Sequence, residues 1–75
     1  MNIQTALIKA TNILENNKIF SARLDAEILL SDVIEKDRKF IILNMEKILS
    51  ANNILNFKNL ITRRSKGEPV AYLIN

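Results

Sequence analysis

Glycine and proline each occur only once in this chain of 75 residues, and this scarcity limits the fold more than any other feature of the sequence. Tight turns between strands rely on these two residues, so an all-β fold is disfavoured. The apolar residues instead recur at helical spacing. The sequence therefore predicts an all-α fold, a compact bundle of about five helices, three longer and two short, with residues 1–75 forming a single helical domain.

An apolar stripe with a period of about 3.6 residues predicts the first helix, over about 2–15. The cluster Asn16, Asn17 and Lys18 is expected to end it, because Asn tolerates the left-handed backbone conformation that often stops a helix. The stripe consists of Ile3, Ala6, Leu7, Ala10, Ile13 and Leu14.

A second helix is predicted over about 22–35, with the Ser21 hydroxyl as the N-cap acceptor for a free backbone N–H. Its apolar stripe is widened by Leu24, Ile28 and Ile34. A helix with so broad an apolar arc makes contacts on more than one side, so we expect it at the centre of the bundle. The stripe itself consists of Ala22, Ala26, Leu29, Leu30 and Val33.

Asp37 is predicted to cap a short third helix over about 38–44, and Ser50 a fourth helix over about 51–65. Residues 45–49 form the connection between them. The core residues expected from this half of the chain are Phe40, Ile41, Leu43, Ile48, Leu49, Ile54, Phe57, Leu60 and Ile61.

Gly67 and Pro69 mark the boundary between the fourth helix and a short fifth one over 70–74. Gly67 stands where a helix stop favours a residue with positive φ. Pro69 suits the first helical position, N1, of the fifth helix. Asn75 is expected to end that helix.

The absence of Cys and His excludes whole classes of chemistry. No disulfide, no Cys/His zinc site and no catalytic triad that uses imidazole or thiol can form. One glycine does not make a phosphate-binding loop. No apolar run approaches the ~20 residues of a membrane span. We therefore expect no catalytic residues, no cofactor, no metal and no membrane contact in this chain, and a reducing, cytoplasmic location.

Two stretches are similar to one known family. Residues 22–30 read Ala-Arg-Leu-Asp-Ala-Glu-Ile-Leu-Leu, and residues 63–73 read Arg-Arg-Ser-Lys-Gly-Glu-Pro-Val-Ala-Tyr-Leu. In this order and at this spacing they resemble the N-terminal domain of the protein-(glutamine-N5) methyltransferases that modify peptide-chain release factors, the PrmC/HemK family. Relatives often have Gly where this chain has Asn75, a residue that also tolerates left-handed backbone.

The resemblance implies a larger parent enzyme. Its C-terminal methyltransferase domain binds S-adenosylmethionine and methylates the glutamine of the Gly-Gly-Gln motif in release factors. The family's glycine-rich loop and its Asn-Pro-Pro-Tyr motif are not in this sequence, so the catalytic domain is expected to lie outside it. In some relatives the same polypeptide also carries a tRNA (guanine-N7) methyltransferase domain. For this chain the family implies a role in recognising and positioning the substrate.

The polar residues of the two motifs have structural interpretations. Arg23 and Glu27 are spaced to pair along one helix face. Asp25 is expected to tie the second helix to the region of Arg63 and Arg64. Gly67, Glu68 and Pro69 together are interpreted as a helix stop followed by a helix start, at a boundary where a linker can begin. Tyr72 is expected to pack its ring and donate one hydrogen bond. The alternative for Tyr72 is a contact with a partner or with the catalytic domain.

Lys36, Arg38, Lys39 and Lys47 form the best candidate for partner binding, either as a contact for an acidic protein surface or as a solvated face. Lys and Arg together exceed Asp and Glu by 11 to 8, a net charge of +3. Two other functions stay open: a freestanding basic helical module that binds nucleic acid, and a structural lid on the catalytic domain. Nucleic acid is disfavoured, because groove-reading domains are more strongly basic and few aromatic side chains are available for stacking.

Overall fold

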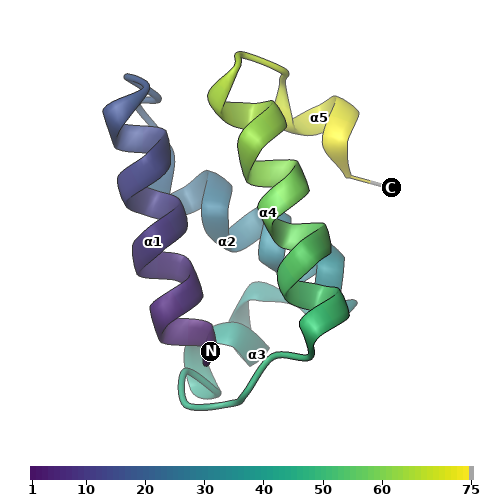
Figure 1. Ribbon diagram of the computed structural model, residues 1–75. Helices are drawn as coiled ribbons and strands as arrows, with labels where there is room; N and C mark the ends of the chain where they lie inside the picture. The colour runs from purple at the N-terminus through teal and green to yellow at the C-terminus, as the bar shows by residue number, and fades with distance from the viewer. Residues whose placement is uncertain (75) are drawn as a thin grey trace.

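The computed structural model describes residues 1–74, which form five helices (Figure 1). They are α1 (Ile3–Asn16), α2 (Ala22–Ile34), α3 (Arg38–Leu43), α4 (Ala51–Ser65) and α5 (Val70–Leu73). The predicted all-α fold with three longer and two short helices is confirmed, and the predicted bounds differ from these by at most one residue at either end. Asn75, which the sequence predicts as the end of the last helix, lies outside the described residues.

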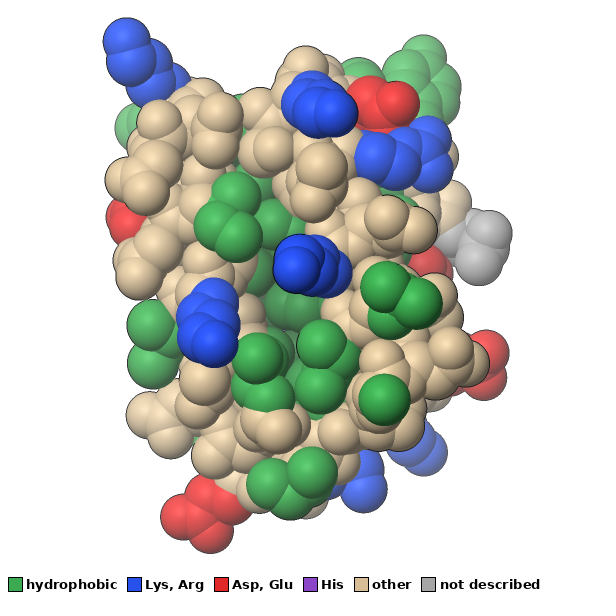
Figure 2. Space-filling view, viewed as in Figure 1, with side chains coloured by type: hydrophobic (Ala, Val, Ile, Leu, Met, Phe, Trp, Pro, Cys, Tyr) green, Lys and Arg blue, Asp and Glu red, His purple; other side chains and the backbone are tan. Residues whose placement is uncertain are grey.

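The helix α2 lies at the centre of the bundle, as its broad apolar arc predicts. It packs against each of the other four helices. Figure 1 shows α1 and α4 side by side, with α2 crossing behind them. The whole measures 28 × 23 × 22 Å. Seen from the same side, the surface shows hydrophobic side chains along the seam between α1 and α4 (Figure 2).

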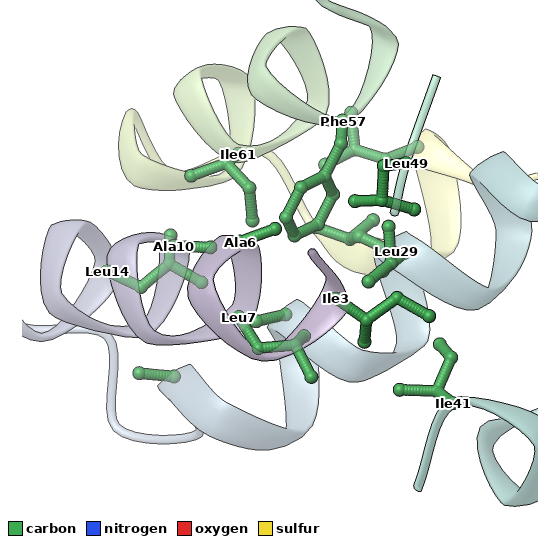
Figure 3. Close-up of a cluster of buried hydrophobic side chains, with 14 residues drawn as sticks. Ile3, Ala6, Leu7, Ala10, Leu14, Leu29, Ile41, Leu49, Phe57 and Ile61 are labelled. Carbon is green, nitrogen blue, oxygen red and sulfur yellow. The ribbon is translucent and has the colours of Figure 1, made fainter. Parts of the chain in front are cut away.

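The core is aliphatic apart from one buried aromatic ring. Phe57 points from α4 toward side chains of α1 and α2 (Figure 3). Withdrawing these side chains from water is the main source of stability in such a bundle. The buried apolar residues are Ile3, Ala6, Leu7, Ala10, Leu14, Ala22, Ala26, Leu29, Leu30, Ile41, Leu49, Phe57, Ile61 and Leu73.

Several predicted core residues lie at the surface instead. Leu43 is 70% exposed and Ile48 is 69% exposed. The short helix α3 packs mainly against α2, so it buries Ile41 and leaves other apolar positions in water. Ile48 is anchored through its backbone, which forms an antiparallel bridge with Asn2. Leu24 and Ile13, at the margins of their stripes, are also partly exposed.

The capping predictions are confirmed at two helices and wrong at a third. Asp37 accepts a hydrogen bond from the Phe40 N–H (2.8 Å), and Ser50 accepts one from Asn53 (3.0 Å). The Ser21 hydroxyl caps nothing; it donates to the Asp25 carboxylate instead (2.9 Å). The backbone of Ser21 (φ −95°, ψ 37°) lacks the extended conformation typical of an N-cap residue, so its oxygen is not placed to accept from the first N–H groups of α2.

The connection 45–49 is fastened to the beginning of α1. The first N–H groups of a helix have no partner within it. Here the N–H of Ile3 donates to the Lys47 carbonyl and that of Gln4 to the Met45 carbonyl, both at 3.0 Å. In return, Leu49 N–H donates to the Met1 carbonyl at 3.0 Å. These bonds explain how a segment without secondary structure of its own keeps Leu49 in the core.

The end of α1 differs in detail from the prediction. The residue with left-handed backbone is Lys18 (φ 62°), and neither Asn adopts it. Asn17 contributes through its side chain, whose amide donates to the Ile13 carbonyl at 2.8 Å. Asn17 therefore takes part in ending the helix, because its side-chain amide adds a second hydrogen bond to a carbonyl that already accepts its backbone N–H.

The end of α4 has the backbone geometry expected at Gly67. Gly67 has φ 102°, its N–H donates to the Arg64 carbonyl (2.9 Å), and the Glu68 N–H donates to the Arg63 carbonyl (3.3 Å). These two bonds form a Schellman motif, which satisfies the last carbonyls of a helix. Pro69 stands one position earlier than predicted: it is the N-cap of α5, and its extended ψ of 143° keeps it outside the helix. No helix between residues 1 and 74 has the length and apolar character needed to cross a membrane.

Replacing Gly67 by Val is expected to lower the free energy of unfolding by about 1–2 kcal/mol, because a side chain disfavours a positive φ. The loss comes from the backbone alone, since an added Cβ meets no atom of the described residues 1–74 within 4 Å. Urea unfolding followed by circular dichroism measures it. Gly67→Asn serves as the control and should lose less. Equal stability of Gly67→Val and wild type would contradict this assignment.

Candidate interaction surface

A buried ion pair joins the beginning of α2 to the end of α4. Asp25 is only 5% exposed, and its Oδ2 accepts a hydrogen bond from Arg64 Nε at 2.9 Å. The same oxygen accepts the bond from the Ser21 hydroxyl. The predicted tie between Asp25 and the arginine pair is therefore confirmed for Arg64.

Arg63 takes a different partner from the one predicted. Its Nε contacts Glu68 Oε2 at 2.5 Å, and both side chains are about half exposed. Arg64 also donates from Nη1 to the Glu68 carbonyl at 3.2 Å. The two arginines therefore hold the Gly67–Pro69 connection through Glu68: Arg63 binds its side-chain carboxylate and Arg64 binds its backbone carbonyl. The position of α5 is thereby linked, through Asp25, to the central helix.

A second charged cluster surrounds Glu27, which is almost buried on α2. Glu27 Oε2 accepts from Arg23 Nε at 2.8 Å, and Oε1 accepts from Arg38 at 2.9 Å from Nη2 and 3.2 Å from Nε. Burial by itself raises the pKa of this carboxyl. The hydrogen bonds and positive charges of Arg23 and Arg38 outweigh burial, so the pKa of Glu27 lies below its ordinary value of 4.5.

The sequence predicts the Arg23–Glu27 pair, but not the third member of the cluster. Arg38 lies 11 positions from Glu27, at the first position of α3. It is one of the four basic residues that the sequence predicts to bind a partner. Only the turn between α2 and α3 brings its guanidinium onto Glu27. No local pattern in the sequence predicts this contact, because it depends on how the turn after α2 directs α3.

The four residues of the predicted basic set have unequal surroundings. Arg38 is paired with Glu27, and the Lys36 ammonium lies 5.4 Å from the centre of the Phe40 ring. Lys39 and Lys47 are exposed, and within residues 1–74 neither forms an ion pair. Lys47 belongs to the segment that follows α3 and is fastened to the beginning of α1. The cations available for a partner are therefore Lys36, Lys39 and Lys47.

Tyr72 differs from its prediction. It is 80% exposed, because the single turn of α5 faces the bundle through Leu73 and directs the preceding side chain outward. The alternative, a contact with a partner or with another domain, stays a prediction. Within the described part of the chain, no three Asp or Glu side chains are grouped so that they could hold a metal ion.

Comparisons with known proteins agree on one family. The family model for the PrmC N-terminal domain matches residues 5–74. The chain is similar to release factor glutamine methyltransferases of Leptospira interrogans (39% identity over 96% of this chain and 25% of the relative) and Buchnera aphidicola (45% over 99% and 26%). It is also similar to a bifunctional methyltransferase of Rickettsia felis (38% over 97% and 14%).

The chain spans about a quarter or less of the length of these relatives. No solved structure matches it.

Replacing Asp25 by Ala is expected to lower the free energy of unfolding by about 2 kcal/mol, because the mostly buried Arg64 loses its carboxylate. Arg64→Ala should cost a similar amount, and the double variant less than the sum of the two. Urea unfolding gives all three values. The exposed pair supplies the control: Arg63→Ala should cost under about 1 kcal/mol. Additive effects at Asp25 and Arg64 would show that the two do not interact.

Glu27 is expected to make stability depend on pH. Because its pKa is lowered in the folded state, its charged form contributes fully above the ordinary value of 4.5, and this contribution is lost as the pH falls through the lowered pKa. In acid, the unfolding free energy of wild type should therefore decrease more steeply than that of Glu27→Gln. Glu15→Gln, at an exposed position of α1, is the control and should follow wild type. Parallel pH profiles for wild type and Glu27→Gln would contradict the assignment.

Proposed function

Because this chain belongs to the PrmC N-terminal domain family of release factor glutamine methyltransferases, we propose that it recognises and positions the protein substrate of such an enzyme. The parent enzyme carries a methyltransferase domain. That domain transfers a methyl group from S-adenosylmethionine to the side-chain amide nitrogen of the glutamine in the Gly-Gly-Gln motif of a peptide-chain release factor. Such a substrate acts with the ribosome, so the same proposal implies a cytoplasmic protein.

The observation that carries this proposal is the family match over residues 5–74. The geometry supports a role in positioning. Holding a large substrate in one orientation contributes to rate by reducing the freedom that the reacting groups must lose. A rigid bundle suits that task, and the contacts of Arg63 and Arg64 with Glu68 fix the segment that follows α4.

The exposed lysines Lys36, Lys39 and Lys47 are the proposed contacts for the release factor. Arg38 contributes less than the sequence suggests, since its guanidinium is engaged by Glu27. Exposed cations favour an acidic surface and accelerate its approach, and salt weakens both effects. The contact proposed here is therefore electrostatic and lies around α3.

Methylation of a purified release factor by the parent enzyme, with S-adenosylmethionine as donor, tests the activity. Mass spectrometry of the Gly-Gly-Gln peptide gives the modified position. Modification of the glutamine is expected in the native sequence and none after replacement of that glutamine. An unmodified glutamine with an enzyme that binds S-adenosylmethionine would refute the proposed reaction.

Reversing the charges of Lys36, Lys39 and Lys47 to Glu in the parent enzyme is expected to raise KM for the release factor about tenfold and to leave kcat nearly unchanged, because the lost contacts serve binding. Arg38 stays intact so that the Glu27 cluster is preserved. The effect should decrease as salt is added. Reversal of the exposed Lys18 and Lys66, on other parts of the surface, is the control. An unchanged KM would favour the structural lid over substrate recognition.

A further inference from the structure

A hollow of about 310 Å³ opens at the surface between α1 and α4. Its base includes Ala6 and Ala10 from α1 and Phe57 and Ile61 from α4. The two alanines stand one helical turn apart on the same face of α1. Because their side chains end at Cβ, they leave a depression in the surface of α1, and the larger residues around them form its walls. We call this hollow the α1–α4 groove.

The walls of the α1–α4 groove are also apolar. Ile13 from α1 and Ile54 from α4 line it, and Ile13 is only about half covered by the rest of the bundle. Figure 2 shows the hydrophobic side chains that gather over the two helices on this face. Exposed apolar surface of this kind, concave and bounded by polar residues, is typical of a docking site.

Among residues 1–74, both charged side chains that line the α1–α4 groove are positive. Lys9 and Lys58, both exposed, line it from opposite helices. The helix α4 contains no Asp or Glu, and the one acidic residue of α1, Glu15, is not among the lining residues. In Figure 2, the acidic side chains lie toward the outline of the molecule, away from the hollow. An occupant is therefore expected to be apolar along its centre and negative along its edges.

We propose that the α1–α4 groove docks an amphipathic helix of another protein, with an apolar stripe flanked by Asp and Glu. An amphipathic helix in a groove uses anchors at i, i+3, i+4 and i+7, and a hollow of this size accepts about two or three aliphatic side chains. Lys9 and Lys58 then face acidic residues on the two sides of that stripe. This surface is distinct from the lysines around α3 and does not depend on which protein the parent enzyme modifies.

Charge argues against a second copy of this chain as the occupant. The chain carries a net charge of +3. A symmetric dimer through the groove would bring Lys9 and Lys58 of one copy toward the same residues of the other. The concave shape argues against a lipid surface, since interfacial helices insert a raised apolar face into the membrane.

A labelled synthetic helical peptide of about 15 residues provides the probe, with Leu at i, i+3, i+4 and i+7 and Glu on both sides of this stripe. Two control peptides match it: one with the same composition in scrambled order, and one with Lys in place of Glu. Fluorescence polarisation measures their affinity for the chain. Amide chemical shifts locate the binding surface. We expect the Glu peptide to bind at least tenfold more tightly than either control and to shift the amides of α1 and α4.

The variant Lys9→Glu/Lys58→Glu is expected to bind the Glu peptide about tenfold more weakly than wild type does and to bind the Lys peptide more tightly than the Glu peptide. Ile13→Gln, at a partly exposed wall position, should weaken the binding of the Glu peptide and of the Lys peptide. The variant Lys18→Glu/Lys66→Glu carries the same change in net charge away from the groove and should bind like wild type. Melting curves check that each variant stays folded.

Several results would overturn the proposal. Equal binding of the scrambled peptide would mean that no helical stripe is recognised, and an equal loss in Lys18→Glu/Lys66→Glu would reduce the effect to net charge. Binding to anionic phosphatidylglycerol vesicles without binding to the peptide would point to a membrane. Dimerisation in sedimentation that Ile13→Gln abolishes would identify a second copy. A parent enzyme that cannot bind the peptide while this chain can would show that another part of its own polypeptide fills the groove.

Discussion

The ion pair between Asp25 and Arg64 connects the beginning of the central helix to the end of α4. Because Asp25 is almost buried, the pair is little screened by water, and its loss would leave a charge without a partner in the interior. Arg64 also binds the backbone of Glu68, so the same contact determines where the chain turns into α5. This interaction therefore helps to position the C-terminal part of the bundle, together with the Schellman bonds at the end of α4 and the burial of Leu73.

The charged side chains differ in their surroundings: two almost buried carboxylates are paired with arginines, and several lysines lie exposed at the surface. Asp25 and Glu27 lie two positions apart on α2. Asp25 pairs with Arg64 of α4, and Glu27 pairs with Arg23 of α2 itself and with Arg38 of α3. Arginine suits this task because its planar guanidinium binds two groups at once. The lysines stay outside, where their compact, hydrated charges are free to meet a partner. The bundle therefore uses arginine to hold itself together and lysine for the contacts that we propose.

The two proposed contact surfaces follow from different physical properties. The lysines around α3 offer charge with little concave surface, which favours rapid, salt-sensitive association. The α1–α4 groove offers apolar surface with charge only at its edges, and such surface contributes affinity when it is covered. Small side chains on α1 create the second surface. The bundle can have this hollow because Phe57 and Ile61 already fill the core beneath it.

The helices and most of their ends follow from the sequence. The stripe from Ile3 to Leu14, the caps Asp37 and Ser50 and the positive φ at Gly67 are local properties, set by side-chain spacing, hydrogen bonding to neighbouring N–H groups and steric freedom at one residue. The family resemblance likewise rests on two short motifs, residues 22–30 and 63–73, whose order and spacing are read directly from the sequence.

Contacts between distant residues required the tertiary structure. The sequence alone leaves Arg63 and Arg64 equivalent beside Asp25, whereas helix geometry directs only Arg64 inward. It does not reveal that the turn after α2 carries Arg38 onto Glu27, that Tyr72 points into solvent, or that Ala6 and Ala10 leave a hollow beside α4. Periodicity identifies the apolar face of a helix. How far that face is covered depends on the neighbouring helices, because burial is a property of the packed bundle and not of any one segment.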